Sequence, residues 1–424
     1  MTRRRSADPP GLPAVLALVF ALVVAAGCGD TSGPGEGPEP ITELPRALSP
    51  TESRLVALSN AFGLELLREV VTGEEGPNVV LSPFSASVAL GMALNGADGE
   101  TFDAMRQTLG HADLEQDAVN TAYRDLLSLL VDLDPAVEFR VANSLWADEG
   151  FPFEEDFVTR VGTHFDAVAR TLDLQAPATL EAINGWVEGE TNGRISTLLE
   201  EVDPLTVMFL INAIYFESDW TLRFNPGETR TAPFRRADGQ EVPVPLMEMR
   251  NVRMPWAWER DFVAVDLPYG GEAFGMLVIL PHEGISAREL AAELSAADLA
   301  ELEASLNETD VDRLALPRFK LSYGKVLDDA LEAMGMGVAF DRLAADFSRM
   351  SSEERLFIDE VWQKTFIEVD EAGTRAAAAT SVDVEAVSPP TLLVADRPFL
   401  FLLRERLSGT ILFAGLVGDP TVES

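Results

Sequence analysis

The spacing of apolar residues changes along the chain from a helical to a strand-like period. Residues 55–71, LVALSNAFGLELLREVV, have apolar side chains at helical spacing, and Thr72 and Gly73 favour the end of a helix directly after them. A second helix is predicted over residues 82–94, because Ser82 suits the N-cap and Pro83 suits the first helical position. The pattern therefore predicts that the first third of the folded part is helical.

Strand patterns dominate the later part of the chain. Runs rich in β-branched and aromatic residues occur at 207–216, 262–269, 274–281, 314–319 and 398–405, and a further strand-like run covers 356–369. Because helices come early and strands late, without regular alternation, we predict an α+β fold with helices packed on mixed or antiparallel sheets. No second low-complexity gap and no internal repeat follows, so residues 51–424 are expected to form a single domain.

One segment near the C-terminal end has the alternating pattern of a strand but a composition that disfavours strand formation. Alternate positions are small or apolar, and the positions between them contain every charge of the segment. The first set is Thr374, Ala376, Ala378, Thr380, Val382, Val384 and Ala386, and the second is Arg375, Ala377, Ala379, Ser381, Asp383 and Glu385. A half-buried strand requires this period of two, but alanines have low strand propensity and Pro389 and Pro390 would end a ladder. The pattern predicts a segment that is able to become a strand without already being one.

The N-terminal part of the chain has the pattern of an export signal followed by a tether. Residues 1–28 contain Arg3, Arg4 and Arg5 and then an apolar run from Leu12 to Ala26, which is too short to span a bilayer comfortably as a permanent helix. The string AAGC at 25–28 resembles a bacterial lipobox, which implies lipid attachment at Cys28, although Ala25 stands where leucine is usual. An ordinary signal peptide with a small-residue cleavage site is the alternative.

Residues 29–50 are rich in Gly, Pro and Glu and are expected to form a flexible linker. Gly29, rather than aspartate, after the cysteine favours delivery to an outer membrane or cell surface by the same resemblance. We therefore expect an exported protein that is lipid-anchored to the bacterial cell envelope, or otherwise secreted.

Charge and residue usage exclude several classes of function. The chain has 424 residues, with 32 Lys and Arg against 70 Asp and Glu, and its formal net charge of −38 disfavours a nucleic-acid ligand. A single cysteine excludes an internal disulfide and a thiolate zinc cluster. The three histidines, His111, His164 and His282, are scattered along the sequence and are expected at the surface. We therefore expect no metal and no cofactor.

Motifs of enzymatic catalysis are missing from the sequence as well. It contains no G-x-S-x-G, no H-E-x-x-H and no phosphate-binding P-loop pattern. Some pairs of carboxylates are inevitable among 70 acidic residues, so such pairs carry no information about a glycosidase-like site. We predict that the protein is not an enzyme.

Several separate motifs follow one another along the chain. They are NVVLSPFSASVALGMALNGADGET (78–101), VANSLWAD (141–148), INGWVEGETNGRI (183–195), INAIYFESDWTLRF (211–224), LALPRFKLSYGKVLDDALEAMGM (314–336) and DRPFLFLLRERLSGTILFAGLVGDP (396–420). In sequence and in order, these motifs resemble the serpins, a family of serine protease inhibitors that also has non-inhibitory members. The resemblance covers almost the whole domain. It implies the serpin fold with an exposed reactive loop, and the loop corresponds to EVDEAGTRAAAATSVDVEAVSPP at 368–390.

The resemblance also assigns roles to particular residues. The hinge of the loop is implied to comprise Glu371, Gly373, Thr374, Ala376, Ala377, Ala378 and Ala379, and the residues that control sheet opening are Ser82, Ser85, Asn212, Trp220 and Gln363. Gln363 departs from the family, which usually has histidine there, so its hydrogen bonds are expected to differ. Counting along the family's loop from Glu371 places the reactive bond between Val387 and Ser388, with Ala386 as the alternative residue before the cut.

An inhibitory serpin traps its target as a suicide substrate. The protease attacks the loop with its own serine, and the resemblance implies that residues 374–387 then insert as a new strand and distort the acyl-enzyme. A valine before the cut fits the small apolar pocket of an elastase-like or subtilisin-like protease. We expect a monomer whose partners are serine proteases and whose membrane contact is the lipid anchor alone. The alternative is a non-inhibitory serpin that serves as a binding or structural module, and the small residues of the hinge favour inhibition.

Overall fold

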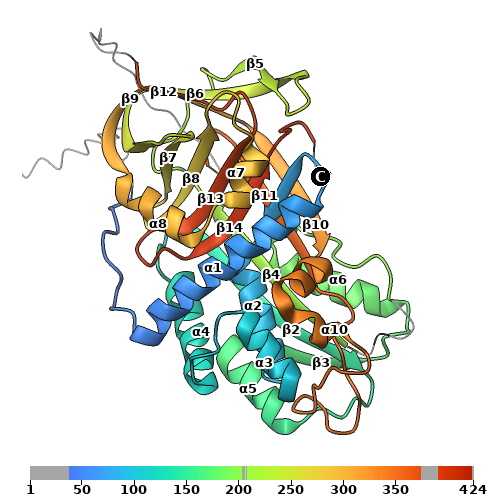
Figure 1. Cartoon of the computed structure of the whole chain (residues 1–424). Helices are drawn as coiled ribbons and strands as arrows, with labels where there is room; N and C mark the ends of the chain where they lie inside the picture. Colours follow the sequence, from blue (N-terminus) through green and yellow to red (C-terminus); the bar gives the residue numbers. More distant parts are fainter. Residues whose placement is uncertain (1–37, 203–205, 207, 374–389, 423–424) are drawn as a thin grey trace, which may run out of the picture. The chain divides into compact units, whose positions relative to one another are not determined.

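In the computed structural model, which describes residues 38–202, 206, 208–373 and 390–422, the first long element is helix α1 (Pro50–Gly73) (Figure 1). Its start is determined locally by a capping box. The Ser49 hydroxyl accepts a hydrogen bond from the Glu52 backbone nitrogen at 3.2 Å, and the Ser49 backbone nitrogen donates to the Glu52 carboxylate at 2.7 Å. The helix ends at Gly73, as the sequence pattern predicts.

Further helices dominate the first part of the described chain, namely α2 (Pro83–Leu94), α3 (Gly99–Thr108), α4 (Gln116–Val131), α5 (Glu155–Phe165) and α6 (Ala178–Glu190). Shorter helices lie later, among the strands, and these are α7 (Ala287–Glu293), α8 (Ala296–Ser305), α9 (Asp328–Leu331) and α10 (Gly337–Phe340), with a short π-helix, η1 (Glu332–Met336), between the last two. Helix α2 is apolar on nearly all sides, and it lies buried between α1, β4 and β14. An all-round apolar helix is stable in water only when it is enclosed in this way.

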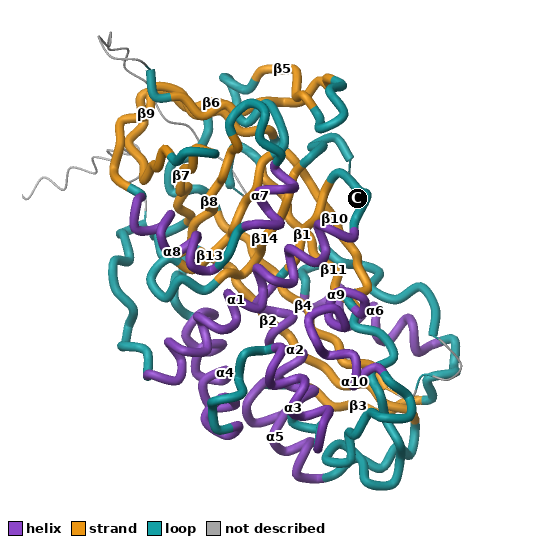
Figure 2. Tube along the Cα trace, viewed as in Figure 1, coloured by secondary structure: helices purple, strands orange, loops and turns teal. Residues whose placement is uncertain are grey.

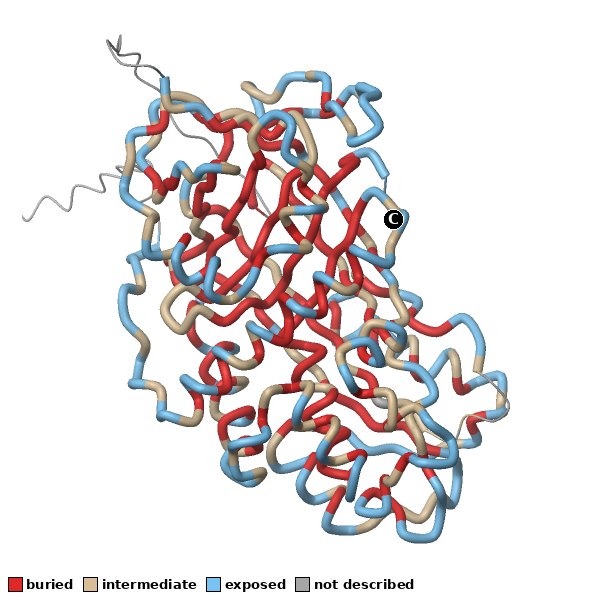
Figure 3. The backbone as a smooth tube through the Cα atoms, viewed as in Figure 1, coloured by how far each residue is buried: buried red, intermediate tan, exposed pale blue. Residues whose placement is uncertain are grey.

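The largest sheet has nine strands and is mostly antiparallel. Its order is β1 (Asn78–Leu81), β14 (Ile411–Val417), β13 (Phe399–Glu405), β8 (Phe274–Pro281), β7 (Phe262–Tyr269), β6 (Glu241–Trp258), β9 (Asn307–Pro317) and β12 (Leu392–Val394), and β5 (Arg230–Arg235) pairs with β6. Helices α1 and α7 contact β14, and α7 also contacts β8 and β13 (Figure 2). Strands β8, β13 and β14 are buried along their whole length, so the core runs through the middle of this sheet (Figure 3).

Two smaller sheets meet at their edge strands β4 and β11. One has the order β3 (Val168–Leu172), β2 (Val137–Asp148), β4 (Met208–Ser218), and the other pairs β10 (Phe319–Val326) with β11 (Trp362–Val369). Strands β4 and β11 contact each other, but among the described residues no ladder joins them. The mixed sheets and their helices confirm the predicted α+β fold.

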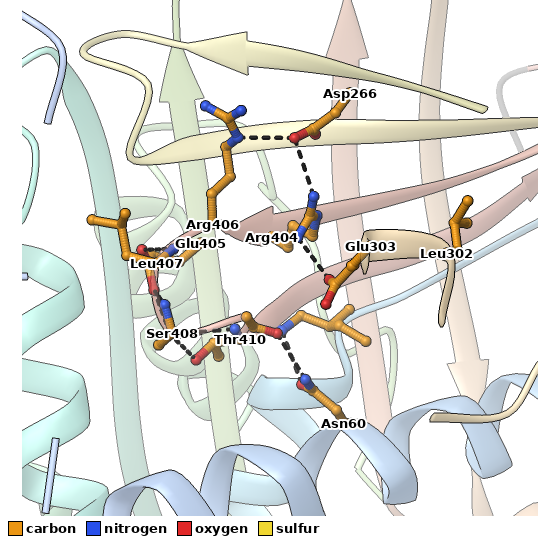
Figure 4. A network of polar contacts seen from close by, with 12 residues as sticks. Asn60, Asp266, Leu302, Glu303, Arg404, Glu405, Arg406, Leu407, Ser408 and Thr410 are labelled. Carbon is orange, nitrogen blue, oxygen red and sulfur yellow. Dashed lines mark hydrogen bonds and ion pairs between the residues drawn. The ribbon is translucent and has the colours of Figure 1, made fainter. Parts of the chain in front are cut away.

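A network of buried charges ties the nine-stranded sheet to α8 (Figure 4). The Asp266 carboxylate on β7 accepts hydrogen bonds from Arg404 at 3.1 Å and from Arg406 at 2.9 Å, and Arg404 also donates to Glu303 on α8 at 2.6 Å. Asp266 is only 1% exposed. Burial raises the pKa of the Glu303 carboxyl, and the neighbouring Arg404 opposes that rise. Because an unpaired buried charge is strongly unfavourable, these residues keep β7, β13 and α8 in one arrangement.

The structure corrects several predicted boundaries. The run at 314–319 is split, since β9 ends at Pro317 and β10 begins at Phe319. Of the strand-like run 356–369, only residues 362–369 form a strand. Within the expected linker, Ile41 donates a backbone hydrogen bond to the Gly271 carbonyl at 2.7 Å, and Ile41, Leu44 and Leu48 pack against the core. This part of the expected tether therefore contacts the domain.

The expectation of a surface histidine at residue 111 is wrong. His111 is fully buried between helices, where its ring meets the Tyr123 ring edge-on with centroids 5.9 Å apart. His164 and His282 are partly exposed. No helix within the described ranges combines the length and the apolar character that crossing a membrane requires.

Candidate functional site

A cavity of about 1370 Å³ opens between β4 and β11. Its walls come from the first residues of β4, from residues 362–364 of β11, from one side of α2 and from residues 198–202 and 355–361, which precede the two strands. The α2 side chains at the cavity include Ala86, Ala89 and Ala93, which are small and leave room above the helix. The gap between the two sheets is thus open toward the beginning of both strands.

Gln363 closes one side of this gap by pairing with the backbone of a single distant residue. Its side-chain nitrogen donates to the Ser82 carbonyl, and its side-chain oxygen accepts from the Ser82 backbone nitrogen, both at 2.9 Å. Both residues are buried. Ser82 is the N-cap residue of α2, as predicted, but its hydroxyl makes no capping bond and instead donates to the Leu412 carbonyl on β14 at 2.7 Å. The amide of Gln363 therefore fixes β11 to the start of α2.

A second series of hydrogen bonds connects α2 to β4. The Ser85 hydroxyl donates to the side-chain oxygen of Asn212. The Asn212 amide donates to Asn143 on β2 at 2.6 Å, and the Asn143 amide donates to the Phe165 carbonyl at 2.7 Å. Asn143 and Asn212 are direct cross-strand partners in the ladder between β2 and β4. These hydrogen bonds hold β4, which lies across the gap from Gln363.

Trp220 holds the far end of β11, where the chain leaves the sheet. Its indole nitrogen donates to the Asp370 carbonyl at 2.9 Å, and its backbone nitrogen donates to the Ala372 carbonyl at 2.8 Å. The indole is buried and stacks on Tyr269, with ring centroids 4.1 Å apart and an angle of 15°. Residues 370–373 form a tight turn closed by an antiparallel bridge between Asp370 and Gly373. The last described residues before the loop are therefore held in a turn against Trp220.

Glu371 anchors the same turn through charge. One guanidinium nitrogen of Arg318 lies 2.5 Å and 2.6 Å from the two oxygens of the Glu371 carboxylate. The Thr229 hydroxyl donates to the same carboxylate at 2.5 Å. Burial opposes ionisation of Glu371, but the hydrogen bonds from Thr229 and Arg318 outweigh it and keep the pKa of the carboxyl below its ordinary value. The carboxylate therefore stays charged and holds the turn against the neighbouring loops.

The structure thus groups the described site residues into two sets. Ser82, Ser85, Asn212 and Gln363 surround the open part of the gap, and Trp220, Glu371 and Gly373 form its closed end. The residues Thr374, Ala376, Ala377, Ala378, Ala379, Val387 and Ser388, together with Cys28, lie outside the described residues.

Several partners of these residues were not found from the sequence. Asn143, Thr229 and Arg318 each complete a contact over a long sequence separation. Asn143 and Arg318 lie within the motifs at 141–148 and 314–336, but the neighbouring residues do not show what they contact. Among the described residues, no group of three or more His, Cys, Asp or Glu side chains is placed to hold a metal ion. The site fixes β11 and β4 to α2 separately, without a ladder between the two strands in the described residues, and secures the turn between β11 and the loop.

Comparisons with known proteins agree with this geometry. A sequence profile described as "Serpin (serine protease inhibitor)" matches residues 57–420. An uncharacterized serpin-like protein of Thermococcus kodakarensis is 36% identical over 428 residues, which cover 96% of this chain and 98% of that protein. Iripin-8 of Ixodes ricinus is 32% identical and covers 87% of this chain and 94% of its own length.

Solved structures share the fold. The thermophilic serpin tengpin in its native state superposes with a TM-score of 0.79 at 30% identity, covering 90% of this chain and 97% of tengpin. Human thyroxine-binding globulin, solved with its hormone, gives a TM-score of 0.80 at 26% identity, covering 88% of this chain and 100% of the globulin. On these matches over nearly its whole length, the chain belongs to the serpin family of serine protease inhibitors.

Proposed function

We propose that this protein inhibits serine-type endopeptidases by suicide-substrate trapping. The observation that carries the proposal is the open gap between β4 and β11, which ends at the turn from which the loop begins. A strand that starts at this turn has a place to enter, because β4 and β11 form no ladder with each other in the described residues. Cleavage of the loop would free residues 374–387 to fill that place.

The bridge between Asp370 and Gly373 sets the register of such a strand. If the antiparallel pairing continues from this bridge, Thr374 opposes Val369, Ala376 opposes Ile367 and Ala378 opposes Thr365. Residues 365, 367 and 369 of β11 are all buried, and cross-strand partners share one face of a sheet. The small residues of the loop would therefore face the interior.

The charged positions of the loop would face outward in the same register. Arg375 would lie opposite Glu368, which is half-buried on the outer face of β11. New ladder hydrogen bonds would contribute about 1 kcal/mol each. Burial of Val382 and Val384 would contribute roughly 1.5–3 kcal/mol for each side chain. The uninserted state would then be kinetically trapped rather than the most stable state.

The target is proposed from the residue before the cut. Val387 before Ser388 suits an elastase-like or subtilisin-like protease with a small apolar pocket. The export signal that ends before Cys28 would be removed, and the lipid anchor on Cys28 with the tether that follows would hold a monomeric inhibitor at the bacterial cell envelope. The sequence of the N-terminal region supports this placement.

A non-inhibitory role is the second candidate. Thyroxine-binding globulin, which has the same fold, is a binding protein by its name. Bulky or charged residues in the hinge would favour such a role, whereas the hinge here contains Ala376, Ala377, Ala378 and Ala379. The composition of the hinge supports inhibition.

The experiment mixes the purified protein with an elastase-like protease. We expect a covalent complex that resists denaturant, and the mass of the released fragment should place the cut after Val387. Thr374→Arg puts a charge at an inward position and should convert the inhibitor into a substrate, whereas Ser381→Arg, at an outward position, should still trap the protease. Clean cleavage without a complex in the unmodified protein would contradict the proposal.

A further inference from the structure

Arg194 contacts both strands that border the gap. It follows helix α6, and one nitrogen of its guanidinium lies 3.5 Å from a carboxylate oxygen of Glu217 on β4. The other terminal nitrogen lies 3.3 Å from a carboxylate oxygen of Glu368 on β11. A single side chain therefore bridges β4 and β11, which share no ladder in the described residues.

The surroundings of Arg194 strengthen this bridge. The guanidinium carbon lies 5.7 Å from the centre of the Phe366 ring on β11, within range of a cation–π contact. The Tyr215 hydroxyl on β4 donates to Glu217, which orients that carboxylate. Burial opposes the charge of Arg194, but Tyr215 and Glu217 outweigh it and keep the pKa of the guanidinium above its ordinary value. The side chains of Arg194, Glu217 and Glu368 are 32%, 24% and 35% exposed, so water screens the pairs less than it would on an open surface.

The segment after α6 is held to β11 by a second contact. The Lys364 ammonium donates to the Thr197 carbonyl at 2.5 Å. Asn192, Arg194 and Thr197 lie in the same connection between α6 and β4. This connection is bonded to β11 through Arg194 and Thr197, and to β4 through Arg194 and through Asn192, whose side-chain nitrogen donates to the Tyr215 hydroxyl at 3.4 Å.

We propose that Arg194 is a clip across the gap and that it sets the rate at which β4 and β11 separate to admit a new strand. This inference rests on the proposed function. Neighbouring strands lie about 4.7–4.9 Å apart, so an added strand moves β4 and β11 apart by roughly that distance. One guanidinium then cannot keep both contacts. The fork of an arginine can serve two carboxylates at once, whereas the ammonium of a lysine is a point charge. Arg194 is therefore a positioning residue that opposes opening.

The test measures how fast the intact protein takes up a synthetic peptide with the sequence of residues 374–387. Arg194→Gln removes both contacts and should raise the uptake rate about fivefold, because two partly exposed ion pairs are together worth on the order of 1 kcal/mol. Arg194→Lys should give a smaller increase. The matched control is Arg140→Gln, because Arg140 pairs with Glu138 on the same strand β2 and bridges no gap. This control should leave the rate unchanged.

Two further measurements separate a clip from a general structural role. In about 1 M salt, the difference between the unmodified protein and Arg194→Gln should shrink, because salt screens the ion pairs. In a Glu217→Gln, Glu368→Gln background, adding Arg194→Gln should have a much smaller effect, because the ion pairs are already gone and the contact with the Phe366 ring remains. Equal rates for Arg194→Gln and Arg140→Gln, or an unchanged difference in high salt, would overturn the clip.

The peptide assay requires no protease, so the two proposals can fail separately. A protein that traps protease but shows no effect of Arg194→Gln on uptake contradicts the clip alone. Suppose that Arg194→Gln raises the rate of peptide uptake but that the protease only cleaves the protein, without forming a complex. That result contradicts the inhibitory function alone. If no variant takes up peptide, the stoichiometry of inhibition, which is the number of inhibitor molecules consumed per trapped protease, is measured instead. Arg194→Gln should lower this number. An unchanged number overturns the clip.

Discussion

The backbone nitrogen of Trp220 lies where a side chain at residue 373 would begin. A Cβ atom built on Gly373 would be 2.1 Å from that nitrogen and 2.6 Å from the Asp219 carbonyl carbon. Gly373 also has a φ of 97°, a conformation that residues with a side chain rarely adopt. The turn that precedes the loop can therefore lie against Trp220 only when residue 373 is glycine.

Replacement of this glycine should loosen the turn. Gly373→Ala adds the strain of a left-handed backbone, about 1–2 kcal/mol, and the displacement of backbone atoms, roughly 1–3 kcal/mol more. Gly409→Ala is the matched control, because Gly409 has a φ of 80° and no atom within 4 Å of an added Cβ. Thermal unfolding should show a clearly larger fall in Tm for Gly373→Ala. Equal falls for both variants would show that the contact with Trp220 is unimportant.

Acid should weaken the contact between Glu371 and Arg318. The pKa of the Glu371 carboxyl is lowered from an ordinary 4.5 in the folded state, so its stabilising effect is complete above that value and is lost as the pH falls through the folded-state pKa. Glu371→Gln should be less stable than the unmodified protein at pH 7, by about 1 kcal/mol, since Arg318 is largely exposed.

The difference between Glu371→Gln and the unmodified protein should disappear in unfolding experiments at low pH. Glu308→Gln is the control, because Glu308 and Arg253 form a pair in which both side chains are exposed. That substitution should change stability very little. A stability difference for Glu371→Gln that persists at all pH values would contradict the assigned role of the charge.

Loss of the Gln363 amide should weaken the attachment of β11 to the start of α2. Gln363→Ala leaves the buried Ser82 nitrogen without its partner, whereas the Ser82 carbonyl still accepts a hydrogen bond from the Ala86 nitrogen. One unsatisfied buried group costs about 1–3 kcal/mol. Gln107→Ala, at an exposed position on α3, serves as the control. Urea unfolding should show a loss for Gln363→Ala only. A Gln363→Ala protein as stable as the control would mean that β11 is held elsewhere.

Buried His111 should make stability depend on pH. Burial, aided by the nearby charge of Arg106, lowers its pKa from 6.5 to about 4. Between these values the unfolded chain binds a proton that the folded protein does not, so stability falls as the pH drops, by up to about 1.4 kcal/mol per pH unit. His111→Gln should reduce this slope in urea unfolding measured from pH 7 to pH 4.5. An identical slope in both proteins would assign the pH dependence to other groups.

Local patterns predicted the features that depend on near neighbours in the chain. The end of α1 at Gly73, the start of α2 at Pro83 and the strands β7, β8 and β13 all follow from capping residues or from apolar periodicity. These patterns act over a few residues, because helix caps and strand faces are set by neighbouring side chains. The family motifs identified Ser82, Asn212, Trp220 and Gln363 in the same way, as residues within short strings.

What those residues contact depends on parts of the chain that lie far away. Ser82 occupies an N-cap position, yet its hydroxyl bonds to Leu412, and Gln363 pairs with Ser82 across 281 residues. Arg194 and Arg318 lie within the family motifs at 183–195 and 314–336, but no pattern predicted their contacts or the burial of His111, because these environments arise only when separate elements pack together. The residue sequence thus determined the elements and the family. Long-range packing decided which side chains border the gap, since hydrogen bonds and burial follow distance in space and not distance along the chain.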